Sequence, residues 1–247
     1  MIRYVPLVLP LIVYATTAQK ADDIIRQSES MLRGKTSTGT YEMTIVTPEY
    51  TRRMEMNTWW DDEGDRSLIE VTAPRREAGN KWLKIGREMW NYLRATETTI
   101  KIPPSMMLQS WNGSDFTNDD LARESSLADD YTHSLLSEEV INGEECWKIV
   151  SKPKPDAAVV WGYIYTWVRK KDNLPSVSQY YDERGKLVRY MVFGDYRNIG
   201  GRVIPTKWVM HNKAKEGHRT EFVIKRAAFD IRIPDAKFSF RELERGN

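Results

Sequence analysis

The sequence predicts a mainly β protein of about eleven short antiparallel strands with few helices. Apolar residues recur with a period of two where Tyr41, Met43 and Ile45 alternate with polar neighbours. Asn142-Gly143 separates two further runs of this kind, which is a strong signal for a hairpin turn. Such strands leave edges and one apolar face unsatisfied. We therefore expect the sheet to curl into a barrel or to pair as a sandwich.

The elements follow one another with short turns. A helix is expected at residues 21–33, because Ile24, Ile25 and Leu32 share one stripe at helical spacing and Gly34 follows. After the strands around Met43 and Met54, further strands are expected at 67–72, 81–85, 88–93, 98–102, 135–141, 146–151, 163–170, 177–181, 187–193, 203–212, 219–226 and 237–240, the last of which closes the sheet.

The N-terminus has the pattern of a secretory signal. Arg3 precedes an apolar run over residues 4–14, and small residues follow up to Ala18. The run is shorter than the ~20 residues that span a bilayer, so we expect cleavage after Ala18 and one mature domain over residues 19–247. An uncleaved N-terminal anchor is the alternative. Cys146 is the only cysteine, which excludes a lipid anchor at the cleavage point and an internal disulfide.

The composition favours a packed protein without nucleic-acid binding. The formal net charge is +2 with both signs interspersed, so the sequence lacks the basic footprint of a nucleic-acid-binding domain. Nine Trp, twelve Tyr, six Phe and ten Met provide ample apolar volume for a core. We expect a monomer.

The segment 106–121 interrupts the strand pattern. Thr117 is a plausible N-cap with Asp120 three residues later, a short-armed capping box that predicts a helix over about residues 118–128. The apolar residues Met106, Met107 and Trp111 precede it without helical or strand periodicity. This segment must pack either on the core of its own domain or over the mouth of a cavity, and we interpret it as a lid.

Three sequence patterns resemble the outer-membrane lipoprotein-sorting, LolA-like superfamily. The first is the GSDFTNDDL run at residues 113–121. The second is the MW-x-YL strand at residues 89–93, and the third is the IPDAKFSF segment at residues 233–240. The resemblance extends over essentially the whole mature chain. It implies a half-open antiparallel β-barrel with an N-terminal amphipathic helix and a helical lid insert over its concave face.

The resemblance also implies a function and a site. Members of this superfamily carry acylated lipoproteins through the periplasm, from an inner-membrane ABC transporter to an outer-membrane acceptor. An arginine on an early strand contacts the lid, and Arg66 is the nearest match here. The GSDF lid belongs to a divergent branch, so the cargo could be another lipid, delivered by a lipid-exporting pump.

Flexible and broad apolar side chains on the strands suit a cavity that repacks around acyl chains. An ordinary β core is the alternative reading of the same residues. The expected cavity residues are Tyr41, Met43, Met54, Met56, Trp90, Tyr92, Tyr163, Tyr165, Trp167, Trp208 and Met210. The expected lid residues are Met106, Met107, Trp111, Gly113, Ser114, Asp115 and Phe116.

No pattern predicts catalysis, a metal or a cofactor. His133, His211 and His218 do not have the spacing of a metal site. Asp119 and Asp120 are explained by helix capping, which leaves Asp115 to a buried partner such as an arginine of the barrel.

Two functions remain open, and an unrecognised hydrolase is a remote third. We expect a periplasmic carrier that is not an enzyme and shields the acyl chains of a lipoprotein or another lipid between the inner and outer membranes. The alternative is a non-carrier module of the cell envelope that docks a partner through its sheet edge or apolar face.

Overall fold

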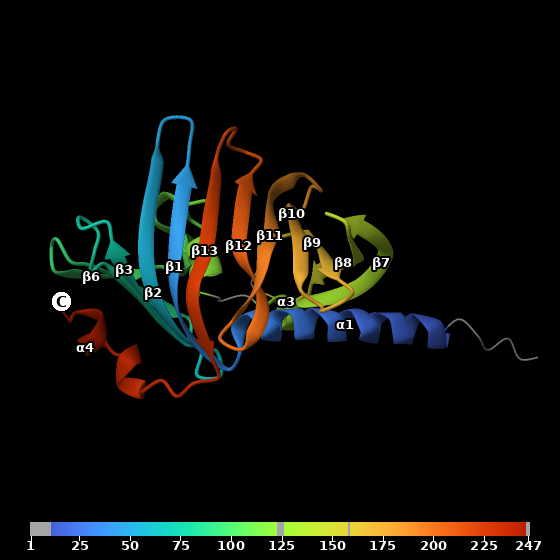
Figure 1. Cartoon of the computed structure of the whole chain (residues 1–247), viewed down its shortest axis with the longest axis horizontal. Coiled ribbons are helices and arrows are strands. Elements are labelled where there is room, and N and C mark those ends of the chain that lie inside the picture. The colour runs from blue at the N-terminus through green and yellow to red at the C-terminus, as the bar shows by residue number, and fades with distance from the viewer. Residues whose placement is uncertain (1–10, 123–125, 158, 246–247) are drawn as a thin grey trace, which may run out of the picture.

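The computed structural model describes residues 11–122, 126–157 and 159–245. It contains one antiparallel sheet of 13 strands in the order β6-β5-β4-β3-β2-β1-β13-β12-β11-β10-β9-β8-β7 (Figure 1). The mainly β, half-open fold is confirmed. The strands are β1 (Thr36–Val46), β2 (Thr51–Asp61), β3 (Arg66–Ala73), β4 (Lys81–Ile85), β5 (Glu88–Leu93), β6 (Thr98–Ile102), β7 (Tyr131–Ile141), β8 (Glu144–Pro153), β9 (Tyr163–Arg169), β10 (Pro175–Tyr181), β11 (Leu187–Ile199), β12 (Arg202–Asn212) and β13 (Arg219–Phe229).

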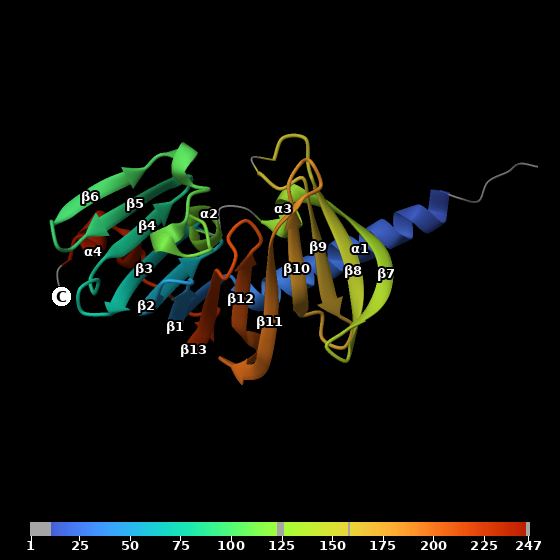
Figure 2. The same cartoon turned by 90° about the horizontal axis from the view of Figure 1, so that it is seen from above.

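The sheet is curved but open. Its two edges, β6 and β7, are consecutive in the chain, and the segment 103–130 joins them. Figure 2 shows this segment, with α2 (Asn118–Ala122) and α3 (Leu127–Asp130), on the inner side of the curve. We call this side of the sheet the concave face and the segment the lid.

Rows of paired residues build the concave face. Met54 pairs with Met43, Met43 with Phe222, and Phe222 with Trp208, so all four side chains point to one side. Met43 and Met54 are fully buried. The alternation seen in the sequence therefore corresponds to one continuous apolar surface across four strands.

Gly39 allows Tyr41 to lie against this surface. A Cβ atom at Gly39 would lie 2.6 Å from the Tyr41 ring and 2.7 Å from the carbonyl oxygen of Arg226. Because glycine has no Cβ, the Tyr41 ring can fold back over β1, where it meets the edge of Trp60 at a centroid distance of 5.5 Å.

Helix α1 (Leu11–Arg33) lies along the far half of the sheet, against β7 and α3 (Figure 1). Ala21, Ile24 and Ile25 are buried against Ile149 and Val168. The expected helix 21–33 lies within α1 and ends, as expected, before a glycine. The proposed signal sequence extends into residues 1–10, which lie outside the described residues, and it stays a prediction.

The lid is less helical than expected. It contains the short 3-10 helices η1 (Pro104–Met106) and η2 (Trp111–Gly113) before α2. The expected single helix over about 118–128 is wrong in extent, because Ser126 is not helical and α3 begins after it. Ser126 has an extended backbone and accepts a hydrogen bond from the amide of Asp129, so it caps a new helix.

The expected strand at 237–240 is wrong. These residues form η3 (Asp235–Phe238) and the start of α4 (Phe240–Leu243), with Ser239 as the N-cap. Phe238 and Leu243 pack on Leu68 and Leu83. Trp59 on β2 packs against the same residues. Trp60, the next residue, points to the concave face. The C-terminal segment therefore covers the opposite face of the sheet. Both apolar side chains are buried without adding a strand.

Candidate functional site

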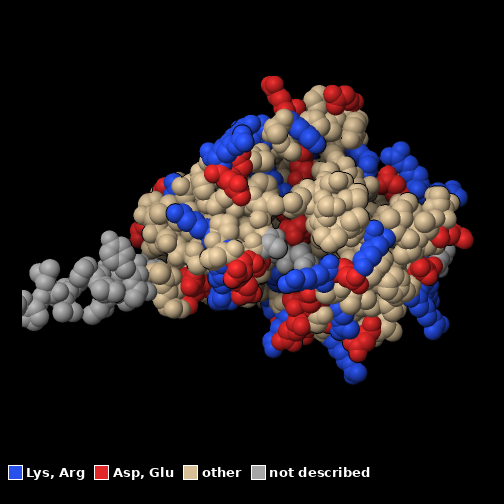
Figure 3. All heavy atoms as spheres, turned by 180° about the vertical axis from the view of Figure 1, so that it is seen from behind, with Lys and Arg blue, Asp and Glu red and all other residues tan. Residues whose placement is uncertain are grey.

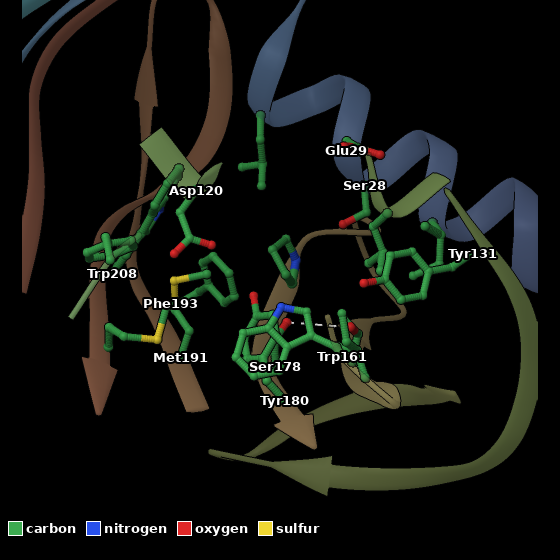
Figure 4. A pocket seen from close by; sticks show the side chains of 18 of the residues that line it. Ser28, Glu29, Asp120, Tyr131, Trp161, Ser178, Tyr180, Met191, Phe193 and Trp208 are labelled. Carbon is green, nitrogen blue, oxygen red and sulfur yellow. Dashed lines mark hydrogen bonds between the residues drawn. The ribbon is translucent and has the colours of Figure 1, made fainter. Parts of the chain in front are cut away.

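A cavity of about 230 Å³ lies between α1, the lid and the concave face of β9 to β12 (Figure 4). The helix contributes Ile25 and Leu32 to its walls, and the lid contributes Phe116. The sheet contributes most of the apolar floor: Ile164, Met191, Phe193, Trp208 and Met210. These side chains are flexible or broad, and such a lining can repack around an apolar guest.

Polar groups share the wall with the apolar floor. Ser28, Thr166 and Ser178 contribute hydroxyl groups, and Glu29 pairs there with Arg33 at 2.8 Å. The lining also includes Asp119, Asp120, Tyr131 and Tyr180. A cavity that combines an apolar floor with polar groups in its wall is typical of a binding site for a small molecule or a lipid chain.

A second, smaller pocket of about 40 Å³ lies beside the first. Tyr41, Trp60 and Phe222 form its aromatic walls. It shares Phe116 and Trp208 with the main cavity. Small shifts of these shared rings would join the two spaces.

The lid fills the remaining half of the concave face, over β1 to β4. Trp111 is fully buried in the same cluster as Met54 and Met56. Among the described residues, no group accepts a hydrogen bond from its indole N–H. This half of the concave face is largely a packed core. Its open volume is the smaller pocket beside Tyr41 and Trp60, and the main cavity lies over the other half.

One arginine of an early strand holds the lid. Arg52, on β2, donates from a terminal nitrogen to the carbonyl oxygen of Asn112 at 3.0 Å and pairs with Glu77 at 3.2 Å. Arg66, the nearest match from the sequence, does not contact the lid among the described residues. It pairs instead with Asp61 and Asp235, because its strand position faces the C-terminal segment.

The predicted capping box is confirmed. The amide of Thr117 donates to Asp120 at 2.7 Å, and the amide of Asp120 donates to the Thr117 hydroxyl at 3.1 Å. Asp115 has a buried partner, but it is Thr220 on β13, whose hydroxyl donates to the carboxylate at 2.9 Å. The local spacing was enough to predict the cap, whereas the partner of Asp115 depends on the tertiary fold.

A buried ion pair ties the lid to β11. Arg189 donates to both carboxylate oxygens of Asp120, at 2.6 Å and 2.7 Å, in bidentate geometry. Burial alone would raise the pKa of Asp120, but the charge and hydrogen bonds of Arg189 hold it below its ordinary value. Burial alone would lower the pKa of Arg189, and the charge of Asp120 raises it. Both groups therefore stay ionised when the lid is closed.

The sequence analysis missed Arg189, although a signal was present. Arg189 is in phase with Met191 and Phe193 along β11 and is 4% exposed. An arginine in an inward-facing apolar row needs a buried anion, because an unpaired charge there is costly.

The expected cavity residues lie in four different places. Trp208 and Met210 line the main cavity, Tyr41 lines the smaller pocket, and Met43, Met54 and Met56 are buried beneath the lid. Trp90 and Tyr92 face the other way and pack with the C-terminal segment. On β9, Ile164 and Thr166 line the cavity, so the alternating Tyr163, Tyr165 and Trp167 lie on the opposite face.

The structure places the expected lid residues at different depths. Met107, Trp111 and Phe116 pack on the concave face, whereas Met106 is 39% exposed. Within the lid, the Ser114 hydroxyl accepts from the amide of Phe116 at 3.2 Å and supports its tight turn. Gly113 has a φ of +78°, the left-handed conformation that glycine tolerates best.

Among the described residues, no three His, Cys, Asp or Glu side chains lie close enough together to hold a metal ion. His133 is buried on β7 with its Nδ1 2.8 Å from the Ser151 hydroxyl. His211 stacks on Tyr190. Figure 3 shows positive and negative side chains interspersed over one face of the molecule, without a field of one sign. None of the described helices is long and apolar enough to cross a membrane.

Three solved structures share this architecture. A DUF1329 family protein from Desulfovibrio piger has a TM-score of 0.83 at 23% identity, covering 92% of this chain and 99% of its own. A putative outer membrane lipoprotein-sorting protein domain from Vibrio parahaemolyticus has a TM-score of 0.79 at 22% identity, with 92% and 100% covered. A LolA superfamily protein from Nitrosomonas europaea has a TM-score of 0.75 at 19% identity, with 92% and 99% covered.

These likenesses confirm at the level of the fold the resemblance found in the sequence. The comparison with curated proteins found no match. A family model described as "Uncharacterized protein" matches residues 63–245, from the turn after β2 to the end of the C-terminal segment. The chain belongs to that family, and its fold is that of the LolA superfamily of outer-membrane lipoprotein-sorting proteins.

Proposed function

We propose that this protein is a periplasmic carrier that shields acyl chains, of a lipoprotein or of another lipid, between the inner and outer membranes. The observation that carries the proposal is the apolar cavity between α1, the lid and the sheet. It needs no covalent chemistry, because enclosing the cargo is enough. The proposed signal sequence would export the chain, and residues 19–247 would act as one unit.

The size of the cavity suggests a closed, empty state. Sites for small ligands usually measure about 300 to 1,000 Å³, and this one is about 230 Å³. Removing an acyl chain from water contributes ~0.8 kcal/mol per methylene, so a carrier must enclose almost all of the chain. Loading would therefore require α1 or the lid to move and the two pockets to merge.

The two halves of the lid would contribute differently. The part around Trp111 is packed as core, whereas α2 and Phe116 border open volume. Displacing α2 exposes the cavity without unpacking the tryptophan. Partners for loading and delivery would be an inner-membrane ABC transporter or a lipid-exporting pump and an outer-membrane acceptor.

Solvent extraction of the natively purified protein, followed by mass spectrometry, tests the carrier function. Acyl lipids or acylated peptides should be recovered from the wild type. Met191→Asp places a charge on the cavity floor and should abolish loading. Val192→Asp is a matched control, because this neighbour on β11 is also half-buried but points to the opposite face. A wild type that stays empty when offered lipid vesicles would overturn the proposal.

The edges of the sheet favour a second candidate function. Leu136 is 50% exposed and Val140 is 69% exposed on the edge strand β7. An envelope module could add a partner strand here without using the cavity. In that case Leu136→Pro should abolish partner binding, whereas Met191→Asp should leave it intact. The carrier function predicts instead that Met191→Asp abolishes lipid loading and that Leu136→Pro leaves loading intact.

A further inference from the structure

All acceptors that Arg189 has among the described residues come from the lid. Its terminal nitrogens donate to the carboxylate of Asp120 at 2.6 Å and 2.7 Å, and one of them reaches the carbonyl oxygen of Asp115 at 3.5 Å. No described group accepts a hydrogen bond from its Nε. The sheet itself therefore supplies no anion for this guanidinium, and it depends on the lid.

Two aromatic rings fix the guanidinium in place. Its central carbon lies 4.6 Å from the ring centroid of Trp161 and 4.6 Å from that of Tyr180. Both rings and Asp120 line the main cavity, and Figure 4 shows the Asp120 carboxylate on the cavity side of α2. Stacking of this kind holds an arginine in a defined orientation even when its carboxylate partner leaves.

We propose that the cargo carries an anionic head, a carboxylate or a phosphate, which takes the place of Asp120 on Arg189 when the lid is displaced. This inference rests on the carrier function and specifies its cargo. The lid carboxylate then acts as an internal substitute for the head of the ligand. An acyl chain would occupy the apolar volume between Met191 and Phe116, with its head against Arg189.

The chemistry favours an acidic head over a neutral or cationic one. Lifting α2 without a replacement leaves a buried arginine unpaired, which a neutral lipid cannot correct. A planar carboxylate or a phosphate restores two parallel charge-assisted hydrogen bonds. A cationic head would meet Arg189 at close range. Two further carboxylates lie in the wall, Glu29 and Asp119, and Glu29 is already paired with Arg33 at 2.8 Å.

The test compares lipids that share one chain and differ in the head. Binding of lauric acid, dodecyl phosphate, dodecanol and dodecylamine to the wild type is measured by calorimetry below their micelle concentrations. We expect the two anionic lipids to bind roughly ten- to hundredfold more tightly than dodecanol. Dodecylamine should bind most weakly. Sodium phosphate alone should not bind measurably, because the chain supplies most of the affinity.

Two variants test whether Arg189 and Asp120 cause the preference for an anionic head. Arg189→Gln should reduce the ratio between lauric acid and dodecanol to about one. Asp120→Asn removes the competing charge, keeps a side chain of the same shape for the cap, and should tighten binding of lauric acid. Arg169→Gln is the matched control: Arg169 is 6% exposed, pairs with Asp172 and stacks on Tyr196 at 3.6 Å. These two partners do not line the cavity, whereas the carboxylate and ring partners of Arg189 do.

The outcomes are distinct. Equal binding of lauric acid and dodecanol by the wild type, or a preference for dodecylamine, overturns the inference and leaves the carrier function standing. An acid preference that persists in Arg189→Gln, or that disappears in Arg169→Gln as well, also overturns it. If Arg189→Gln does not fold, a failure of Asp120→Asn to tighten lauric acid binding decides against it. Failure of all four lipids to bind refutes the carrier function itself.

Discussion

The indole ring of Trp111 packs against that of Trp82, with centroids 4.8 Å apart and planes inclined by 50°. One ring belongs to the lid and the other to β4, so the centre of the lid is part of the hydrophobic core. Phe116, Asp120 and Leu127, farther along the lid, border the cavity instead.

Trp111→Ala should therefore destabilise the protein strongly. The side chain is fully buried, and truncating a buried tryptophan costs about 3 to 5 kcal/mol. Denaturant unfolding measures the loss. Leu108→Ala, at a lid position that is 48% exposed, should stay within ~0.5 kcal/mol of the wild type. A comparably small effect at Trp111 would show that the whole lid is mobile.

The Asp120–Arg189 pair should make stability depend on acid pH. The pKa of Asp120 lies below its ordinary value of 3.8. The unfolded state therefore takes up a proton first as the pH falls, and the pair stabilises the fold fully only above that value. This contribution is lost as the pH falls through the lower pKa of the folded protein.

Urea unfolding at a series of pH values measures this dependence in the wild type and in Asp120→Asn. The variant should be less stable at neutral pH and should lose less stability below pH 3.8, where the unfolded wild type takes up a proton on Asp120. Parallel curves for the two proteins would show that the pair contributes nothing.

His133 should add a second pH dependence at milder acidity. Burial lowers the pKa of His133 below its ordinary value of 6.5, although Asp22 and Glu29 on α1 act in the opposite direction and Arg26 reinforces it. The unfolded state therefore binds the proton first, and stability falls as the pH drops below 6.5. Because α1 packs on this strand, its contacts should loosen first.

Hydrogen exchange of the α1 amides at pH values on either side of 6.5 detects this loosening. His133→Asn keeps a polar atom near Ser151 but does not titrate in this range. Its exchange, once corrected for the intrinsic pH dependence of amide exchange, should therefore not change there. Identical pH profiles for wild type and variant would exclude His133 as the cause.

Lys81 should hold the C-terminal segment on the sheet. Its side chain is 2% exposed, and its ammonium group donates to the carbonyl oxygens of Glu242 at 3.1 Å and Arg245 at 2.8 Å. Lys81→Met leaves both carbonyls without this donor, which costs about 1 to 3 kcal/mol. Exchange of the amides in residues 235–245 should rise. Lys225→Met, at an exposed lysine of β13, is the control and should leave their exchange unchanged.

Local signals in the sequence predicted local structure well. The spacing of Thr117 and Asp120 is sufficient for a capping box, because both hydrogen bonds lie within one turn. The alternation predicted an antiparallel sheet, and the resemblance implied that this sheet is half-open. The helix after the cap was overestimated, because Ser126 starts a new helix and its preference for a cap outweighs continuation.

The sequence alone did not show which face of each strand points inward. Alternation on β9 separates Tyr163 and Trp167 from Ile164, but it does not say which set faces inward. The aromatic set is outward because polar partners support it there: the indole of Trp167 donates to Glu139 at 2.7 Å. Large rings at half-covered surfaces resemble core residues in a sequence, so the cavity floor was assigned to the wrong side on this strand.

The lid is attached to both edges of the open sheet, since it leaves β6 and returns to β7. A segment held at both ends can bow outward but cannot swing away like a flap. Under the proposed carrier function, outward bowing of the lid would therefore pull on both edge strands at once. Filling of the cavity would then be coupled to the spacing between β6 and β7.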